Sequence, residues 1–94
     1  MQTDSMIFDN GGEYKMRLIK FETVNCTPCK MVDSLLNSKN IKPEVLEVTE
    51  NMEYAESLGV SSVPVLILFD DNDKEVSRVL GFKPAEIDKL ISQL

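Results

Sequence analysis

The apolar residues of this chain change their spacing at Cys26, and that change limits the folds open to it. Residues 16–21 form a nearly continuous apolar run broken by basic residues, which is typical of a strand buried on both faces. After Cys26 the spacing becomes that of an amphipathic helix, with apolar residues at Cys29, Val32, Leu35 and Leu36. Pro28 suits the first turn of such a helix, because its missing N–H costs nothing there. We therefore expect a strand, a junction at Cys26 and a helix that ends near residues 37–40.

Shorter patterns predict the other elements. Strands are expected at 44–48, 65–69 and 75–80, the last two joined by a turn at 70–73. A helix is expected at 51–58, capped by Thr49 and stopped by Gly59. Gly81 ends the last strand, and Pro84 opens a final helix. The apolar stripe of that helix comprises Ile87, Leu90, Ile91 and Leu94.

The resulting order, β-α-β-α-β-β-α, predicts an α/β fold with one mixed four-stranded sheet. The first crossover implies parallel strands, and the later hairpin adds an antiparallel edge, with helices on both faces. We assign the domain to residues 16–94. Residues 1–15 are expected to form an N-terminal arm or a short extra strand near residues 6–8.

The composition argues against several kinds of partner. The formal charge is −6 over 94 residues, whereas nucleic acids and anionic membranes attract an electropositive surface. We expect no nucleic-acid and no membrane partner, since no stretch approaches a membrane span and the start lacks a secretory signal. A cytoplasmic location is the corresponding expectation. The chain has no histidine, which removes Ser-His and Cys-His nucleophile schemes.

The only two cysteines, Cys26 and Cys29, allow three interpretations: half of a metal site, a structural staple, or a redox couple. Helical residues at i and i+3 lie about 5–5.5 Å apart at Cα, which permits a disulfide without backbone movement. Cys26 is expected at the helix N-terminus, where unpaired N–H groups and the helix dipole stabilise a thiolate. Cys29 is expected to be shielded. This asymmetry predicts thiol–disulfide exchange, in which Cys26 attacks and Cys29 resolves, without a cofactor.

The other two interpretations have less support. Structural zinc needs four ligands, usually Cys and His, so a metal would have to bridge a dimer through the C-x-x-C or recruit carboxylates. An iron–sulfur cluster shared between two chains meets the same objection. A structural disulfide that closes so short a loop would restrain the unfolded chain very little.

From residue 16 to residue 94 the chain resembles the thioredoxin family. The motif CTPCK at 26–30, the motif GVSSVP at 59–64, the hairpin and Gly81 before the last helix fall in register with that family. The resemblance implies a cis Val63–Pro64 bond that faces the cysteine pair, with the Val63 backbone pairing with an extended substrate segment. A trans proline that opens a strand is the alternative.

The resemblance also implies a function and partners. It implies a monomeric protein-disulfide reductase that acts on protein disulfides and is recharged by a thioredoxin-reductase-like or other dithiol reductant. The candidate substrate-binding residues are Thr27, Pro28, Val63, Pro64, Gly81 and Phe82. Together with Val60, two of these residues, Val63 and Phe82, are expected to form an apolar docking patch. A binding module that uses the groove beside Val63–Pro64, with little redox turnover, is the alternative from a different class.

Two positions before the cysteines depart from the thioredoxin pattern. The tryptophan that precedes the first cysteine in typical thioredoxins is Asn25 here. Their buried aspartate, the proton acceptor of the resolving cysteine, is replaced by Lys20, and its lysine partner falls near Val45. The glutaredoxin markers, Pro-Tyr between the cysteines and Gly-Gly near Gly81, are missing. The chain is therefore interpreted as a minimal thioredoxin-like protein rather than a glutathione user.

Lys20 is a candidate for tuning the pKa of the cysteines. An ammonium group beneath the site would favour a thiolate, lower a cysteine pKa and shift the couple toward an oxidant. The alternative is that the Lys20 side chain extends to the surface.

Overall fold

The structure is a computed structural model that describes residues 16–94. The arm and the short strand expected within residues 1–15 lie outside the described residues. The elements, in chain order, are β1 (Arg17–Glu22), α2 (Thr27–Ser38), β2 (Glu44–Glu47), the 3-10 helix η1 (Val48–Glu50), α3 (Met52–Ser57), β3 (Val65–Phe69), β4 (Glu75–Leu80) and α4 (Pro84–Ile91).

The four strands form one mixed sheet in the order β2-β1-β3-β4. β1 pairs in parallel with β2 and antiparallel with β3, and β3 pairs antiparallel with β4. The predicted α/β fold, with its parallel crossover and antiparallel edge, is therefore confirmed. β3 lies inside the sheet and all five of its residues are buried, as its apolar run predicts.

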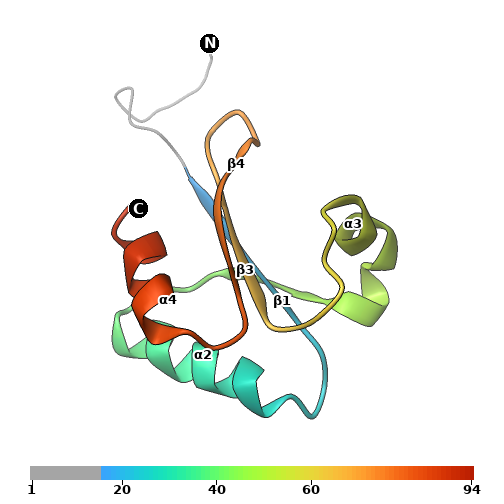
Figure 1. The fold of residues 1–94 in the computed structure, drawn as a ribbon, viewed down its shortest axis with the longest axis horizontal. Helices are drawn as coiled ribbons and strands as arrows, with labels where there is room; N and C mark the ends of the chain where they lie inside the picture. The colour runs from blue at the N-terminus through green and yellow to red at the C-terminus, as the bar shows by residue number, and fades with distance from the viewer. Residues whose placement is uncertain (1–15) are drawn as a thin grey trace.

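Helices cover both faces of the sheet. α2 and α4 lie on one face and α3 on the other (Figure 1). The cluster under α2 and α4 is built from Leu18, Val32, Leu36, Leu66, Leu68, Val79, Ile87 and Leu90. The cluster under α3 is built from Ile19, Phe21, Ala55, Val65, Ile67 and Phe69. Residues of β1 and β3 alternate between these two clusters, because successive side chains of a strand point to opposite faces.

Two details of the predicted helices are wrong. Thr49 lies inside η1 and does not cap α3, because its hydroxyl donates to the carboxylate of Glu47. Asn51 stands at the N-cap of α3 instead, without a side-chain capping bond. Leu94 is 54% exposed and does not extend the apolar stripe of α4, which ends three residues earlier at Ile91.

Candidate redox site

The two cysteines lie at the junction between β1 and the first turn of α2. Cys26 is the N-cap of α2, and Pro28 occupies the first turn. Cys26 and Cys29 form a disulfide, with their Cα atoms 5.2 Å apart, inside the predicted range. The backbone N–H of Cys29 donates to the Sγ atom of Cys26 at 3.1 Å. The helix N-terminus therefore presents a donor to the first sulfur, as the sequence predicts.

The two sulfurs differ in their access to solvent. Cys29 is only 3% exposed and faces the core beside Val32, whereas Cys26 is half-buried. Thr27 and Pro28, between them, are exposed. A reagent that arrives from solvent therefore meets Cys26 first, and Cys29 is placed to react only with a sulfur already bound at Cys26.

The loop that leads into the site was not assigned a role from the sequence. Val24 is 73% exposed, an unusual position for a valine, and Met31 on the first turns of α2 is also exposed. Asn25 has a φ of 57°, a left-handed conformation that asparagine tolerates better than most residues. The exposure of Val24 could have been predicted from the sequence, since this valine belongs neither to the apolar run of the strand nor to the helical stripe.

The segment before β3 carries the second group of predicted site residues. The Val63–Pro64 peptide bond is cis, as the resemblance implies, and Pro64 is buried. The N–H of Gly81 donates to the carbonyl oxygen of Pro64 at 2.8 Å, so these two predicted residues lie together. Gly81 has a φ of 83°, in the region that favours glycine.

The three residues of the expected docking patch pack in two places. Val60 and Val63 pack against the cluster under α3, while Phe82 packs against the cluster under α2 and α4. All three are half-buried. Val60 and Val63 therefore lie on one face of the sheet and Phe82 on the other, so the three residues share no core cluster.

Lys20 is fully buried, so the alternative that its side chain extends to the surface is wrong. Its Nζ atom donates to Asp33 Oδ1 at 2.6 Å and also to the carboxylate of Glu22. Its parallel neighbour in β2 is Val45, which supplies no charge. A buried ammonium needs ionised partners. Glu22 supplies one from the end of β1, and Asp33 supplies the other from α2, which covers this face of the sheet.

The sequence reasoning missed Glu22 and Asp33. The strand period places Glu22 on the same face as Lys20, and the helix period places Asp33 one turn after Cys29. No sequence pattern shows that both residues bind Lys20, because the contact with Asp33 depends on how α2 packs on β1.

Glu47, at the end of β2, is a further carboxylate, and its pKa is shifted. The pKa of Glu47 is lowered, first by a hydrogen bond from the Thr49 hydroxyl and then by Thr23 and nearby backbone N–H groups, against the opposing effect of burial. Glu47 lies opposite Glu22 in the sheet register, and Thr23 begins the loop that leads to Cys26.

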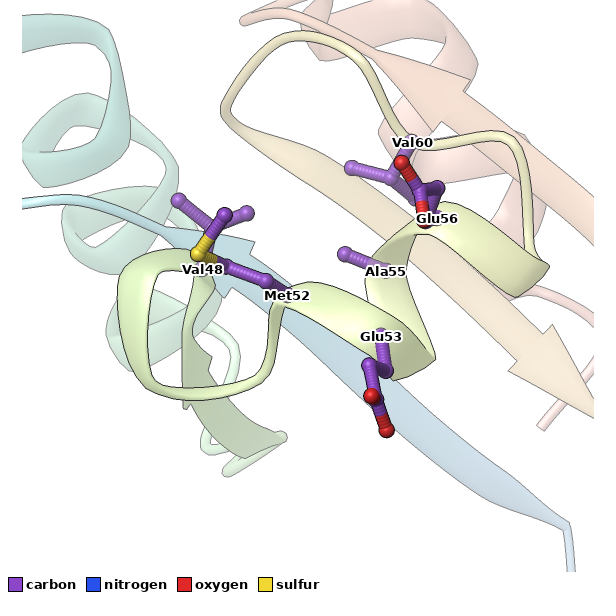
Figure 2. Close-up of a pocket in the computed structure, with 6 residues that line it drawn as sticks. All are labelled: Val48, Met52, Glu53, Ala55, Glu56 and Val60. Atoms are coloured by element: carbon purple, nitrogen blue, oxygen red, sulfur yellow. The ribbon is translucent and has the colours of Figure 1, made fainter.

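A pocket of about 310 Å³ lies elsewhere, over α3 (Figure 2). It is lined by Val48, Met52, Glu53, Ala55, Glu56 and Val60, and neither cysteine contributes to it. Among residues 16–94, no group of three or more His, Cys, Asp or Glu side chains is arranged to hold a metal ion. None of the helices in the same part of the chain is long and apolar enough to span a membrane.

Comparisons with known proteins agree with this geometry. The protein-family model described as Glutaredoxin matches residues 18–72. The SPbeta prophage-derived thioredoxin-like protein YosR of Bacillus subtilis is 51% identical over 79 residues, which are 84% of this chain and 99% of that protein. A thioredoxin of Staphylococcus haemolyticus is 36% identical over 90 residues, covering 89% of this chain and 85% of the relative.

The solved structures show the same fold. Thioredoxin NaTrxh from Nicotiana alata superposes with a TM-score of 0.73 at 30% identity, covering 84% of this chain and 72% of that one. A disulfide-forming C-x-x-C at a helix N-terminus, a cis-proline before β3 and these relatives lead to one conclusion. The chain belongs to the thioredoxin-like family of thiol–disulfide oxidoreductases.

Proposed function

We propose that this protein reduces disulfide bonds in other proteins through the Cys26–Cys29 couple. The observation that carries the proposal is the asymmetry of the two sulfurs. Cys26 is reachable and receives the N–H of Cys29 at 3.1 Å, while Cys29 is buried behind it. A thiolate is the attacking species in disulfide exchange, so a donor aimed at Cys26 favours attack by that residue.

The proposed cycle has two exchange steps. The Cys26 thiolate attacks one sulfur of the target disulfide, forms a mixed disulfide and releases the other target sulfur as a thiolate. Cys29 then attacks the Cys26 sulfur, which forms the Cys26–Cys29 bond and releases the second target thiol. Two electrons pass from the pair to the target, and an external dithiol reductant restores the pair.

The target segment is proposed to bind beside the cis-proline. The Val63 backbone would pair with an extended segment, as an added strand does at a sheet edge. The hydrogen bond from Gly81 to Pro64 holds two chain segments together at this place. The residues proposed to contact the target are Thr27, Pro28, Val63, Pro64, Gly81 and Phe82.

The partners follow from the family and remain part of the proposal. Relatives named thioredoxin support protein disulfides as substrates, with a thioredoxin-reductase-like or other dithiol reductant upstream. We propose that the protein works as a monomer in the cytoplasm and does not use glutathione as its main reductant. Lys20 is proposed to tune the titration of the cysteine pair, acting together with the two carboxylates that it binds.

The reduction of insulin by dithiothreitol, followed with and without the protein, tests the proposal. Wild type should accelerate the reduction, and Cys26→Ser should abolish the acceleration. Cys29→Ser should accumulate a mixed disulfide with the target, which non-reducing electrophoresis detects. If wild type and Cys26→Ser perform alike, the protein is no reductase, and retained binding of an oxidised target would then favour the binding module.

Two further measurements address the remaining alternatives. Recycling by glutathione alone, compared with recycling by a thioredoxin reductase and NADPH, separates the two classes of reductant. Elemental analysis of the purified protein, together with its oligomeric state by light scattering, tests the metal-bridged dimer. Zinc or iron in a dimer that lacks exchange activity would replace the redox proposal.

A further inference from the structure

We further propose that Asp33 is the base that accepts the proton of the Cys29 thiol, with Lys20 as the residue that positions it. This inference rests on the exchange reaction proposed above, because only a resolving Cys29 has a proton to lose. It assigns a function to a buried ionic cluster, formed by Lys20, Glu22 and Asp33, that the two cysteines alone do not require.

Cys29 needs such a base. Its thiolate, not its thiol, is the nucleophile of the resolving step, yet the residue is only 3% exposed. Burial in apolar surroundings disfavours the charged form of a thiol. The chain contains no histidine to collect the proton. A carboxylate within direct reach, or within reach through one water molecule, can serve as the general base instead.

Asp33 has the required position. It lies four residues after Cys29 on α2, and helical residues at i and i+4 are surface neighbours. Helical side chains lean toward the helix N-terminus, so the Asp33 side chain leans toward the turn that carries Cys29. The side chain is 44% exposed, which lets it pass a proton on to solvent. Asp33 thus connects a buried thiol with water.

Lys20 holds the base in place. Its fully buried ammonium binds Asp33 Oδ1 at 2.6 Å and leaves Asp33 Oδ2 for another partner. The same ammonium binds Glu22, so two carboxylates face one positive charge. When all three groups are ionised the cluster has a formal charge of −1, so one carboxylate can take up a proton while the buried Lys20 keeps an ionised partner.

The other charged groups around α2 have partners of their own. From α4 and the end of α2, Asp88 binds Lys39 at 3.0 Å, and Glu86 faces Lys83. Lys30 is exposed on α2 itself. Arg78 and Arg17 belong to the other face of the sheet, because their strand neighbours Ile67 and Phe69 are part of the cluster under α3. Among the described residues, Asp33 is the carboxylate that shares a helix face with Cys29.

With this proton transfer, every bond and proton of the resolving step is accounted for. In the mixed disulfide, the Cys29 S–H bond breaks and its proton passes to the Asp33 carboxylate. The Cys29 thiolate attacks the Cys26 sulfur, the Cys26–Cys29 bond forms and the bond from Cys26 to the target sulfur breaks. The target sulfur leaves as a thiolate and takes up a proton, which Asp33 has meanwhile released to solvent. When the pair is reduced again, the proton returns to Cys29 by the same route.

The test separates the two steps with an aromatic disulfide, 5,5′-dithiobis(2-nitrobenzoate), mixed rapidly with reduced protein. The first release of the coloured thiolate reports attack by Cys26, and the second release reports resolution by Cys29. We expect Asp33→Asn to slow the second phase by about 100-fold near neutral pH and to leave the first phase within about twofold. Its second phase should rise steeply with pH, because hydroxide then replaces the lost base.

Further variants make the test specific. Asp88→Asn removes a carboxylate from an equivalent lysine pair at the far end of α2 and should leave both phases unchanged. Glu22→Gln removes the other partner of Lys20 and should slow the second phase by less than about fivefold, because the base remains. Asp33→Glu should recover most of the lost rate. The Lys20→Met/Asp33→Asn pair, compared with Lys20→Met, repeats the comparison if Asp33→Asn alone does not fold.

The outcomes distinguish the two proposals. An unchanged second phase in Asp33→Asn overturns the role of Asp33, as does an equal loss in Glu22→Gln, which would indicate only loss of the ionic cluster. If wild type itself shows no second phase, Cys29 does not resolve, and the proposed exchange reaction fails whatever Asp33 does.

Discussion

The ammonium group of Lys20 lies 2.6 Å from a carboxylate oxygen of Asp33, and no part of the Lys20 side chain is exposed. The two residues come from β1 and α2, so the contact ties the strand before the cysteines to the helix that carries them. Glu22 completes the cluster from the end of the same strand. The members differ in burial, since both carboxylates retain access to water and the lysine has none.

That difference predicts an asymmetric effect on stability. Glu22→Ala/Asp33→Ala leaves a buried ammonium without a partner and should lower the free energy of unfolding by about 3–5 kcal/mol. Lys20→Met removes the buried charge and lets both carboxylates return to water, so its cost should stay below about 1 kcal/mol. Urea unfolding measures both. A Lys20→Met variant less stable than the double variant would contradict the explanation.

Gly81 and Gly59 form a matched pair for testing the substrate groove. Both have a positive φ, and a Cβ atom added at either would meet nothing within 4 Å. Gly81→Ala and Gly59→Ala should therefore each cost about 1–2 kcal/mol of stability, from backbone conformation alone. Gly81→Ala keeps the N–H that binds Pro64, but its added methyl group lies among the residues proposed to contact the target, whereas Gly59 is not among them. Only Gly81→Ala should therefore slow insulin reduction, by about fivefold, or about 1 kcal/mol. Equal activity in the two variants would remove Gly81 from the proposed binding residues.

Val24 offers a test of target docking that leaves the fold intact. It is 73% exposed and lies two residues before Cys26, so a target bound at Cys26 can bury it. Val24→Ser should raise the KM for insulin by about fivefold, the loss of roughly 1 kcal/mol of apolar burial. Val76→Ser is the control, since Val76 is also exposed but lies on β4 and not in the loop that leads to Cys26. Both variants should keep their stability within about 0.5 kcal/mol of wild type.

The stability of the fold should fall in acid because of Glu75. A hydrogen bond from Arg78 lowers the pKa of Glu75 below its ordinary value of 4.5. The unfolded state then binds more protons than the folded state as the pH drops below 4.5, so the stabilising effect of the ionised group is lost as pH falls through the folded-state pKa. Urea midpoints measured from neutral pH to about pH 3 should decline less steeply in Glu75→Gln than in wild type. Parallel profiles would show that the Glu75–Arg78 pair has no part in acid unfolding.

Most of the fold was predictable from apolar spacing. The apolar runs of β1 and β3 and the helical stripe through Cys29, Val32 and Leu36 are local patterns, and each element they predict is present. Gly59 and Gly81 were recognisable as stops because glycine adopts positive φ values readily, and both have positive φ in the structure. The cap of α3 was misassigned, because Thr49 and Glu47 satisfy each other's hydrogen bonds within η1, a competition that spacing does not reveal.

The redox pair was also predictable, and its surroundings were not. By itself, the sequence determined that two thiols three residues apart begin a helix, since a Cys-x-x-Cys run after a buried strand puts one sulfur at the N-cap and the other on the apolar face. Only the tertiary structure decided that Lys20 is buried and bound to Asp33. The reason is physical: a lysine side chain is long enough to reach solvent from a strand, and it stays inside here because two carboxylates, one brought by the packing of α2 on β1, replace the water that its charge requires.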